Sequence, residues 1–384
     1  MPLSAAYVTE EMDKASKAGD PEADQLVSDL IDRQEVDGVN ALFRTVGTLQ
    51  HGQDRSHLPP RLAEFLEKAE AEPPGWNSAD VKAAQKFFSR HKGEVAMLQG
   101  TVGLIGTYLS PTGAFTLRST GRLGGVEGPG RRLSQSSRLF IDMDKPDAMT
   151  SGRLAADVTK VRLVHASVRQ LHKKSGKWEY AKWGEPVSQK YTTGAACVFS
   201  VQILEAMRHL GIDVSTDDAH GFMCAWHYVN HYLGTPEKWL LPKDADEVDR
   251  LWRKEREREW QKTEDGVHMT AQAVTYYKQF LPGPSHDAFL AMVRHALTDK
   301  YADMAGLPRG VLDLAAKPLT GGHKAVSGIG GGLLGGAAEK TTKVNPYKEI
   351  LGVASGAFRE MQSAAVRQGQ DDQPQMHQEL GDDR

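Results

Sequence analysis

The chain has 384 residues, of which 40% are hydrophobic and 25% charged, as in an ordinary soluble globular protein. Its formal net charge of -3 and the lack of a basic stripe exclude a typical nucleic-acid-binding protein. No segment reaches the roughly 20 apolar residues that cross a bilayer, and the N-terminus does not resemble a secretory signal. We therefore expect a cytoplasmic protein without an integral membrane span.

Helical periodicity recurs along the chain, whereas alternating runs of β-branched residues bounded by turns do not appear. The predicted fold class is therefore all-α. Helices are expected within 21–50, after Pro59-Pro60, from Ser78 to about His91, and at about 94–109, 131–143, 154–173, 186–211, 217–233, 245–262, 268–280 and 285–304.

The chain changes character after about residue 318. The glycine-rich segment 327–338 has no strand before it, so we expect a linker there and no phosphate-binding loop. The last twenty residues are rich in Gln and Asp, which predicts disorder. We divide the chain into an N-terminal helical extension that packs on the core (1–75), a large helical domain (76–318) and a linker with a flexible C-terminal tail (319–384).

The two cysteines, Cys197 and Cys224, belong to no CxxC or other metal-ligand spacing. Both lie in apolar helical surroundings. We expect two buried free thiols, which agrees with a reducing compartment.

The expected helix at 154–173 contains the most informative pattern. Its buried face is marked by Val158, Val161, Val168 and Leu171. His165 follows Val161 by four residues and precedes Val168 by three, so it projects from the same face. Arg162, Arg169 and His172 are expected close to His165 on one line along the helix surface. A neutral imidazole there could bind a metal through one nitrogen, although a core histidine is the commoner outcome.

Other histidines offer a competing metal site. His227 and His231 are four residues apart and share a helix face, but Tyr228 stands where a zincin would carry Glu. Glu205 and His209 are also four apart, whereas the di-iron bundles use a spacing of three. A non-haem metal protein therefore stays as an alternative.

The segment Lys160-Val-Arg-Leu-Val-His165-Ala-Ser-Val-Arg169 resembles the signature helix of the latex clearing proteins, which are haem b rubber oxygenases. Their superfamily includes the endoplasmic-reticulum-bound oxygenase of mycophenolic acid biosynthesis. The resemblance covers about residues 80–305, and the stretches that agree with it in order are Ala84–His91, Arg131–Met143, Gly184–Gln189 and Asn230–Gly234.

This resemblance implies a single globin-like helical domain that encloses a haem pocket, with His165 as the proximal iron ligand. It implies that Arg162 and Arg169 anchor haem propionates or position His165. Arg132, Gln135 and Ser136 would face the iron from the distal helix. Gln135 and Ser136 replace the Lys and Thr of the rubber oxygenases, and Thr112 occupies the region of their catalytic Glu.

The function that the resemblance implies is a haem b-dependent oxygenase that uses O2 on a small apolar substrate, such as an alkene or terpenoid. Three alternatives stay open: a haem-binding sensor or storage protein without turnover, a helical bundle without haem, and the non-haem metal protein.

Overall fold

The computed structural model describes residues 3–36, 54–56, 58–123, 139–140, 142–310 and 348–368. These ranges contain helices and no strand, which confirms the all-α fold class. The helices are α1 (Val8–Ala15), α2 (Pro21–Asp32), α4 (Pro60–Ala69), α5 (Ser78–Leu98), α6 (Leu104–Tyr108), α7 (Pro111–Leu123), α9 (Arg153–Ser175), α10 (Tyr180–Trp183), α11 (Gln189–Phe199), α12 (Val201–His209), α13 (Thr216–Tyr232), α14 (Ala245–Glu259), α15 (Glu264–Lys278), α16 (Pro284–Ala305) and α18 (Lys348–Gln368).

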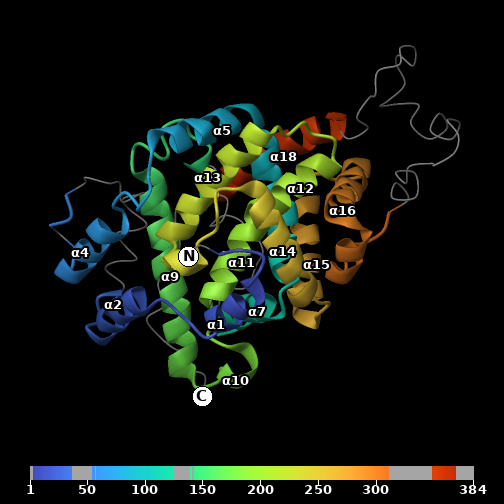
Figure 1. Cartoon of the computed structure of the whole chain (residues 1–384). Coiled ribbons are helices and arrows are strands. Elements are labelled where there is room, and N and C mark those ends of the chain that lie inside the picture. Colours follow the sequence, from blue (N-terminus) through green and yellow to red (C-terminus); the bar gives the residue numbers. More distant parts are fainter. Residues whose placement is uncertain are drawn as a thin grey trace, which may run out of the picture.

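Helix α9 runs along one side of the molecule, with α2 and α4 on its outer side and the remaining helices on its inner side (Figure 1). The large apolar core lies on the inner side, where α5 and α13 form the most extensive helix pair. A second, smaller apolar cluster joins α2 and α4 to α9 through residues such as Leu30, Leu62 and Leu163. Helix α9 is therefore enclosed by protein on both sides.

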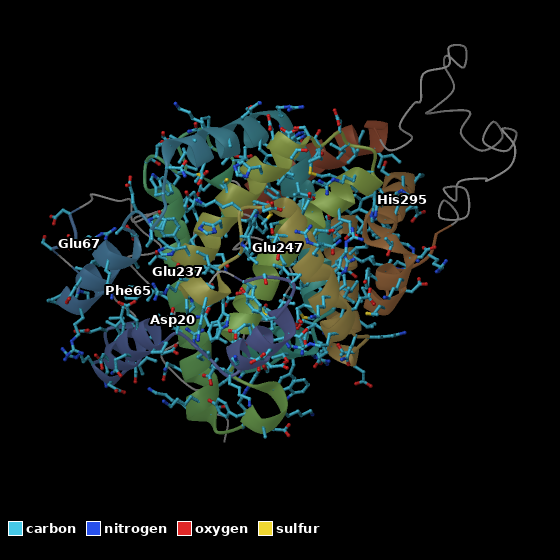
Figure 2. All side chains as sticks on the ribbon, viewed as in Figure 1. Asp20, Phe65, Glu67, Glu237, Glu247 and His295 are labelled. Carbon is cyan, nitrogen blue, oxygen red and sulfur yellow. The ribbon has the colours of Figure 1, made fainter. Side chains whose placement is uncertain are left out.

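The sequence explains where α2 begins. Asp20 caps the helix, since its carboxylate accepts a hydrogen bond from the Ala23 amide at 3.3 Å, and Pro21 occupies the first helical position. Asp20 and Phe65 of α4 lie in the same region of the molecule (Figure 2), and the Phe65 ring packs under the Arg162 guanidinium, 5.0 Å from its centroid. The cap of α2 thus lies at the junction of three helices.

Helix α5 runs through the break that the sequence predicted between His91 and Glu94. It continues into a π-helical turn at Gln99–Gly103 and then into α6. Gly93 stays helical, and a Cβ atom there would come within 2.5 Å of the Arg359 guanidinium of α18. This glycine therefore permits close approach of another helix and does not end its own.

The predicted helix over 186–211 is divided into α11 and α12 at Ser200, whose backbone is non-helical with φ -117° and ψ -91°. The Ser200 hydroxyl donates to the Ala196 carbonyl at 2.6 Å. Such a bond competes with the helical backbone pattern, which accounts for the division.

Four of the described helices, α1, α7, α10 and α18, lie outside the ranges that the sequence predicted. Helix α7 begins at Pro111, within the stretch taken as a loop, because proline fits the first turn of a helix. Helix α18 lies inside the stretch taken as a loosely attached tail, yet it packs on α5 and buries Phe358. Most of the expected helix at 131–143 and the glycine-rich segment 327–338 lie outside the described residues.

Among the helices within the described ranges, none combines the length and apolar character that a bilayer crossing requires. Cys197 and Cys224 are both buried free thiols, as predicted.

Candidate functional site

Helix α9 presents an apolar stripe that contains a single imidazole. Val161, Val164 and His165 lie at spacings of three and four residues, and all three are partly accessible. Leu163 and Ala166, on the side of α9 that faces α2 and α4, are fully buried. The partly accessible stripe is therefore turned away from the second apolar cluster.

His165 is neutral at physiological pH. Burial, together with the neighbouring positive charge of Arg169, lowers the pKa of His165 from 6.5 to about 3. His165 is nevertheless partly accessible. Among the described residues, none forms a hydrogen bond with the imidazole, so a nitrogen lone pair is available for a ligand.

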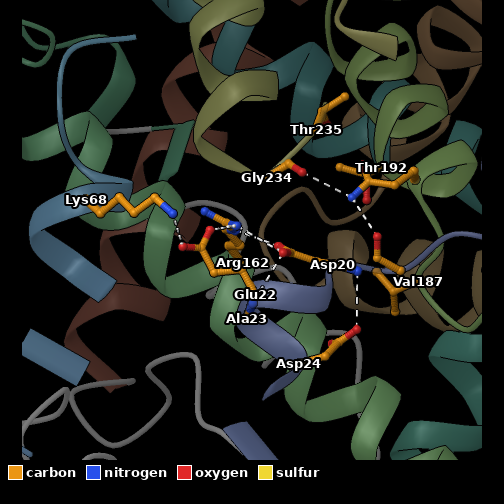
Figure 3. Close-up of polar contacts among 12 residues, drawn as sticks. Asp20, Glu22, Ala23, Asp24, Lys68, Arg162, Val187, Thr192, Gly234 and Thr235 are labelled. Atoms are coloured by element: carbon orange, nitrogen blue, oxygen red, sulfur yellow. Dashed lines mark hydrogen bonds and ion pairs between the residues drawn. The ribbon is translucent and has the colours of Figure 1, made fainter. Parts of the chain in front are cut away.

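Arg162 lies on the side of α9 that faces α2, and its guanidinium donates hydrogen bonds to carboxylates. Its Nε donates to Asp20 Oδ2 at 2.5 Å, and its Nη2 donates to Asp20 Oδ1 at 3.0 Å and to Glu22 Oε2 at 3.2 Å (Figure 3). Glu22 in turn pairs with Lys68 of α4 at 2.6 Å. This charge network ties α9 to α2 and α4.

Arg169 forms the second tie, one turn beyond His165. Its Nε donates to Asp24 Oδ1 at 2.6 Å and its Nη1 donates to the Val187 carbonyl at 3.0 Å. Its Nη2 is buried without a hydrogen-bond partner in the described part of the chain. The cost of burial outweighs the pairing with Arg169 and raises the pKa of Asp24 above its usual value. The guanidinium therefore links α9, α2 and the turn before α11.

No local sequence pattern identifies the carboxylate partners of these two arginines. Asp20, Glu22 and Asp24 lie in the first turns of a helix, where acidic residues are common for reasons of the helix dipole alone. Only the packing of α2 on α9 shows that they face Arg162 and Arg169.

His172, which the sequence placed near Arg162, His165 and Arg169 on the helix surface, contacts α7. Its Nε2 lies 3.3 Å from the Thr120 hydroxyl and 3.5 Å from that of Ser119, both on α7. The ring packs against Trp178 at 4.6 Å between centroids. His172 therefore joins α9 to α7.

The competing histidines do not assemble a complete metal site in the described ranges. His227 Nδ1 donates to the Leu241 carbonyl at 2.6 Å. Burial and the neighbouring His227 and Arg162 lower the pKa of His231 to about 4. Within the described ranges, neither histidine belongs to a cluster of three His, Cys, Asp or Glu side chains. His209 donates to the Ala296 carbonyl at 3.0 Å, while Glu205 pairs with Arg256.

A cavity of about 660 Å³ lies between α1, α6, α10, α11 and α14. Its wall includes the aromatic residues Tyr191, Trp252 and Trp260 and the aliphatic residues Leu3 and Val8. Thr112, at the position where rubber oxygenases were expected to carry a Glu, also lines it. His165 is not among the lining residues, so the cavity and the α9 stripe are separate features.

The predicted distal residues Arg132, Gln135 and Ser136 lie outside the described residues. Their role stays a prediction. The structure describes His165, Arg162 and Arg169 on one helix, with only His165 lacking a hydrogen-bond partner among the described residues.

Comparisons with known proteins agree with this architecture. The sequence profile of the family described as "ER-bound oxygenase mpaB/B'/Rubber oxygenase, catalytic domain" matches residues 90–327. A rubber oxygenase of Streptomyces sp. (strain K30) is 27% identical over 295 residues, which span 76% of this chain and 71% of that protein. The solved structure of the latex clearing protein LCP in the closed state has the same fold, with a TM-score of 0.72 over 91% of both chains at 23% identity.

The profile match covers more than half of the chain and includes α9 with His165. This chain therefore belongs to the family of ER-bound oxygenases of the mpaB/B' type and rubber oxygenases, of which it carries the catalytic domain.

Proposed function

We propose that the protein is a haem b-dependent oxygenase in which His165 binds the iron and O2 is used to oxidise a small apolar substrate. The observation that carries the proposal is the neutral imidazole on an apolar stripe of α9, without a hydrogen-bond partner in the described ranges, within a chain of the oxygenase family. A haem iron needs such a neutral imidazole, and an apolar surround suits the macrocycle.

Bound haem would supply the oxygen chemistry, and the protein would set its course through the axial ligand and the surrounding polarity. His165 would hold the iron through one ring nitrogen. Val161 and Val164 would keep water away from it. Arg162 and Arg169 would act as positioning residues, because their ion pairs with Asp20 and Asp24 hold the helix that carries His165.

On the opposite side of the haem, we propose Arg132, Gln135 and Ser136 as catalytic residues that orient the oxygen substrate by hydrogen bonding. The proposed substrate class is an alkene or terpenoid, by analogy with the family. Thr112 supplies no carboxylate base, so the reaction is proposed to differ from that of a rubber oxygenase.

The first experiment is the visible spectrum and pyridine haemochrome of the purified protein. A Soret band with one b-type haem per chain is expected. His165→Ala should lose the haem while the helical circular dichroism is kept, and His165→Gly should regain it when imidazole is added. His268→Ala, an exposed histidine of α15, is the matched control. A colourless protein that takes up no added haemin would overturn the proposal.

Two further measurements refine the site. Gln135→Lys should shift the ferric spectrum toward six-coordinate low spin, because lysine can ligate the sixth position. An unchanged spectrum would remove Gln135 from the distal side. The second candidate function is a haem sensor or storage protein, and the lack of a carboxylate at Thr112 favours it. Oxygen uptake in the presence of apolar alkenes is expected of an oxygenase and not of a sensor or storage protein.

A further inference from the structure

Three side chains with different donor atoms meet where α5 and α13 lie side by side, apart from the helix that carries His165. Asp80 comes from the first turn of α5, and His220 and Cys224 lie one turn apart on α13. One potential ligand atom from each lies within 4.8 Å of the others. We propose that Asp80, His220 and Cys224 form a binding site for a zinc-class divalent cation.

The orientation of His220 supports the proposal. Its Nδ1 lies 3.3 Å from the Lys243 carbonyl, which can only accept, so Nδ1 carries the proton. The lone pair is therefore on Nε2, which lies 3.4 Å from Cys224 Sγ. Histidine ligands of metals are commonly held this way, with the second ring nitrogen donating to a backbone carbonyl.

Asp80 is oriented by a second set of hydrogen bonds. The Tyr228 hydroxyl donates to Asp80 Oδ2 at 2.6 Å, the Asn77 side-chain amide donates at 2.9 Å, and the Lys243 ammonium donates as well. All three bonds reach the same carboxylate oxygen. Oδ1 accepts none of them, and the Cys224 thiol lies within hydrogen-bonding reach of the carboxylate. One oxygen is thus used for orientation, whereas the other accepts none of these three bonds.

The donor set selects the class of cation. A thiolate, an imidazole and a carboxylate match the ligands of zinc, whereas magnesium and calcium prefer oxygen alone. Three protein ligands leave a fourth tetrahedral position for water. On binding, the Cys224 thiol would lose its proton to solvent and the sulfur would donate an electron pair to the cation. No electron transfer is involved.

The cluster of Asp80, His220 and Cys224 is partly buried and partly open to solvent. Cys224 and Asp80 are buried, whereas His220 is exposed, so the cluster opens to solvent on the His220 side. Lys243 contributes a positive charge that competes for Asp80. We therefore expect an affinity below that of a structural zinc site with four protein ligands.

The test uses the full, untagged chain and measures Zn²⁺ by equilibrium dialysis with elemental analysis. One bound Zn²⁺ per chain is expected. His220→Ala and Cys224→Ser should each weaken binding by more than about tenfold, which is the scale of loss at protein metal sites. His220 is exposed, so its variant tests the site without disturbing the core.

Control variants separate this site from others. Cys197→Ser removes the other buried thiol, and His165→Ala removes the proposed iron ligand; both should keep the Zn²⁺. Co²⁺ in place of Zn²⁺ should give the absorption of a cobalt–thiolate bond, and this should disappear in Cys224→Ser. Equal zinc content in wild type and His220→Ala, or loss of zinc in Cys197→Ser alone, would overturn the proposal. Neither result depends on haem binding at His165.

Discussion

Arg162 of α9 and Asp20 at the start of α2 face each other with two parallel hydrogen bonds, Nε to Oδ2 at 2.5 Å and Nη2 to Oδ1 at 3.0 Å (Figure 3). Both side chains are buried, and Asp20 also caps α2. The same carboxylate therefore caps the start of α2 and holds α9. Because α9 carries His165, this pair connects the N-terminal helices to the candidate site.

Arg162→Met should destabilise the fold by about 3–5 kcal/mol, since it leaves the Asp20 charge buried without its partner. Adding Asp20→Asn should recover part of the loss, because asparagine still caps a helix but carries no charge. Urea unfolding measures both. Arg61→Met is the control, since its pair with Asp29 is largely exposed and should contribute less than about 1 kcal/mol. Equal effects of the two arginine variants would contradict the buried pair.

Variants of Arg169 and Asp24 can show whether Arg169 positions α9 or contacts the haem directly. If Arg169 acts by holding α9, then Asp24→Asn and Arg169→Met should weaken haem retention to similar extents, and the double variant should be no worse than either. Haem transfer to apomyoglobin measures retention. A much larger loss in Arg169→Met than in Asp24→Asn would instead assign the guanidinium to the haem.

The haem-free protein should lose stability in acid because of His165. Its pKa is about 3 in the folded chain and about 6.5 when unfolded, so between these values only the unfolded state binds the proton. The free energy of unfolding should therefore fall with decreasing pH, by about 1.4 kcal/mol per pH unit from this group.

His165→Gln should flatten that dependence between pH 6.5 and 3, while His268→Gln on the surface should leave it as in wild type. Thermal unfolding at a series of pH values measures the difference. Parallel pH curves for wild type and His165→Gln would show that His165 ionises normally in the folded chain.

Gly100 and Phe358 test whether α18 belongs to the folded domain. A Cβ atom at Gly100 would lie 2.0 Å from Phe358 Cζ, and Phe358 is only 3% exposed. Gly100→Ala should destabilise by about 1–3 kcal/mol through overpacking, and Phe358→Ala by about 3–5 kcal/mol. The two losses should not add in the double variant, because the smaller side chain removes the clash. Additive losses would mean that α18 does not dock against this turn.

The sequence by itself determined the fold class and most helix positions, and it singled out His165 as a candidate ligand. Helical periodicity and caps are local, so α4, α9, α13, α14 and α16 could be predicted within a few residues. The family resemblance rests on Val161 to Arg169, a contiguous stretch that is readable without coordinates. The division of the chain at residues 75 and 318 stays a prediction.

Only the tertiary structure decided what the charged residues do. The carboxylate partners of Arg162 and Arg169 lie more than a hundred residues away in sequence, and no local pattern encodes a contact at that separation. The same holds for Asp80 beside Cys224, and for α18, whose docking depends on the absence of a side chain at Gly100. Periodicity reports which face of a helix is buried, whereas the identity of what covers that face depends on how distant segments pack.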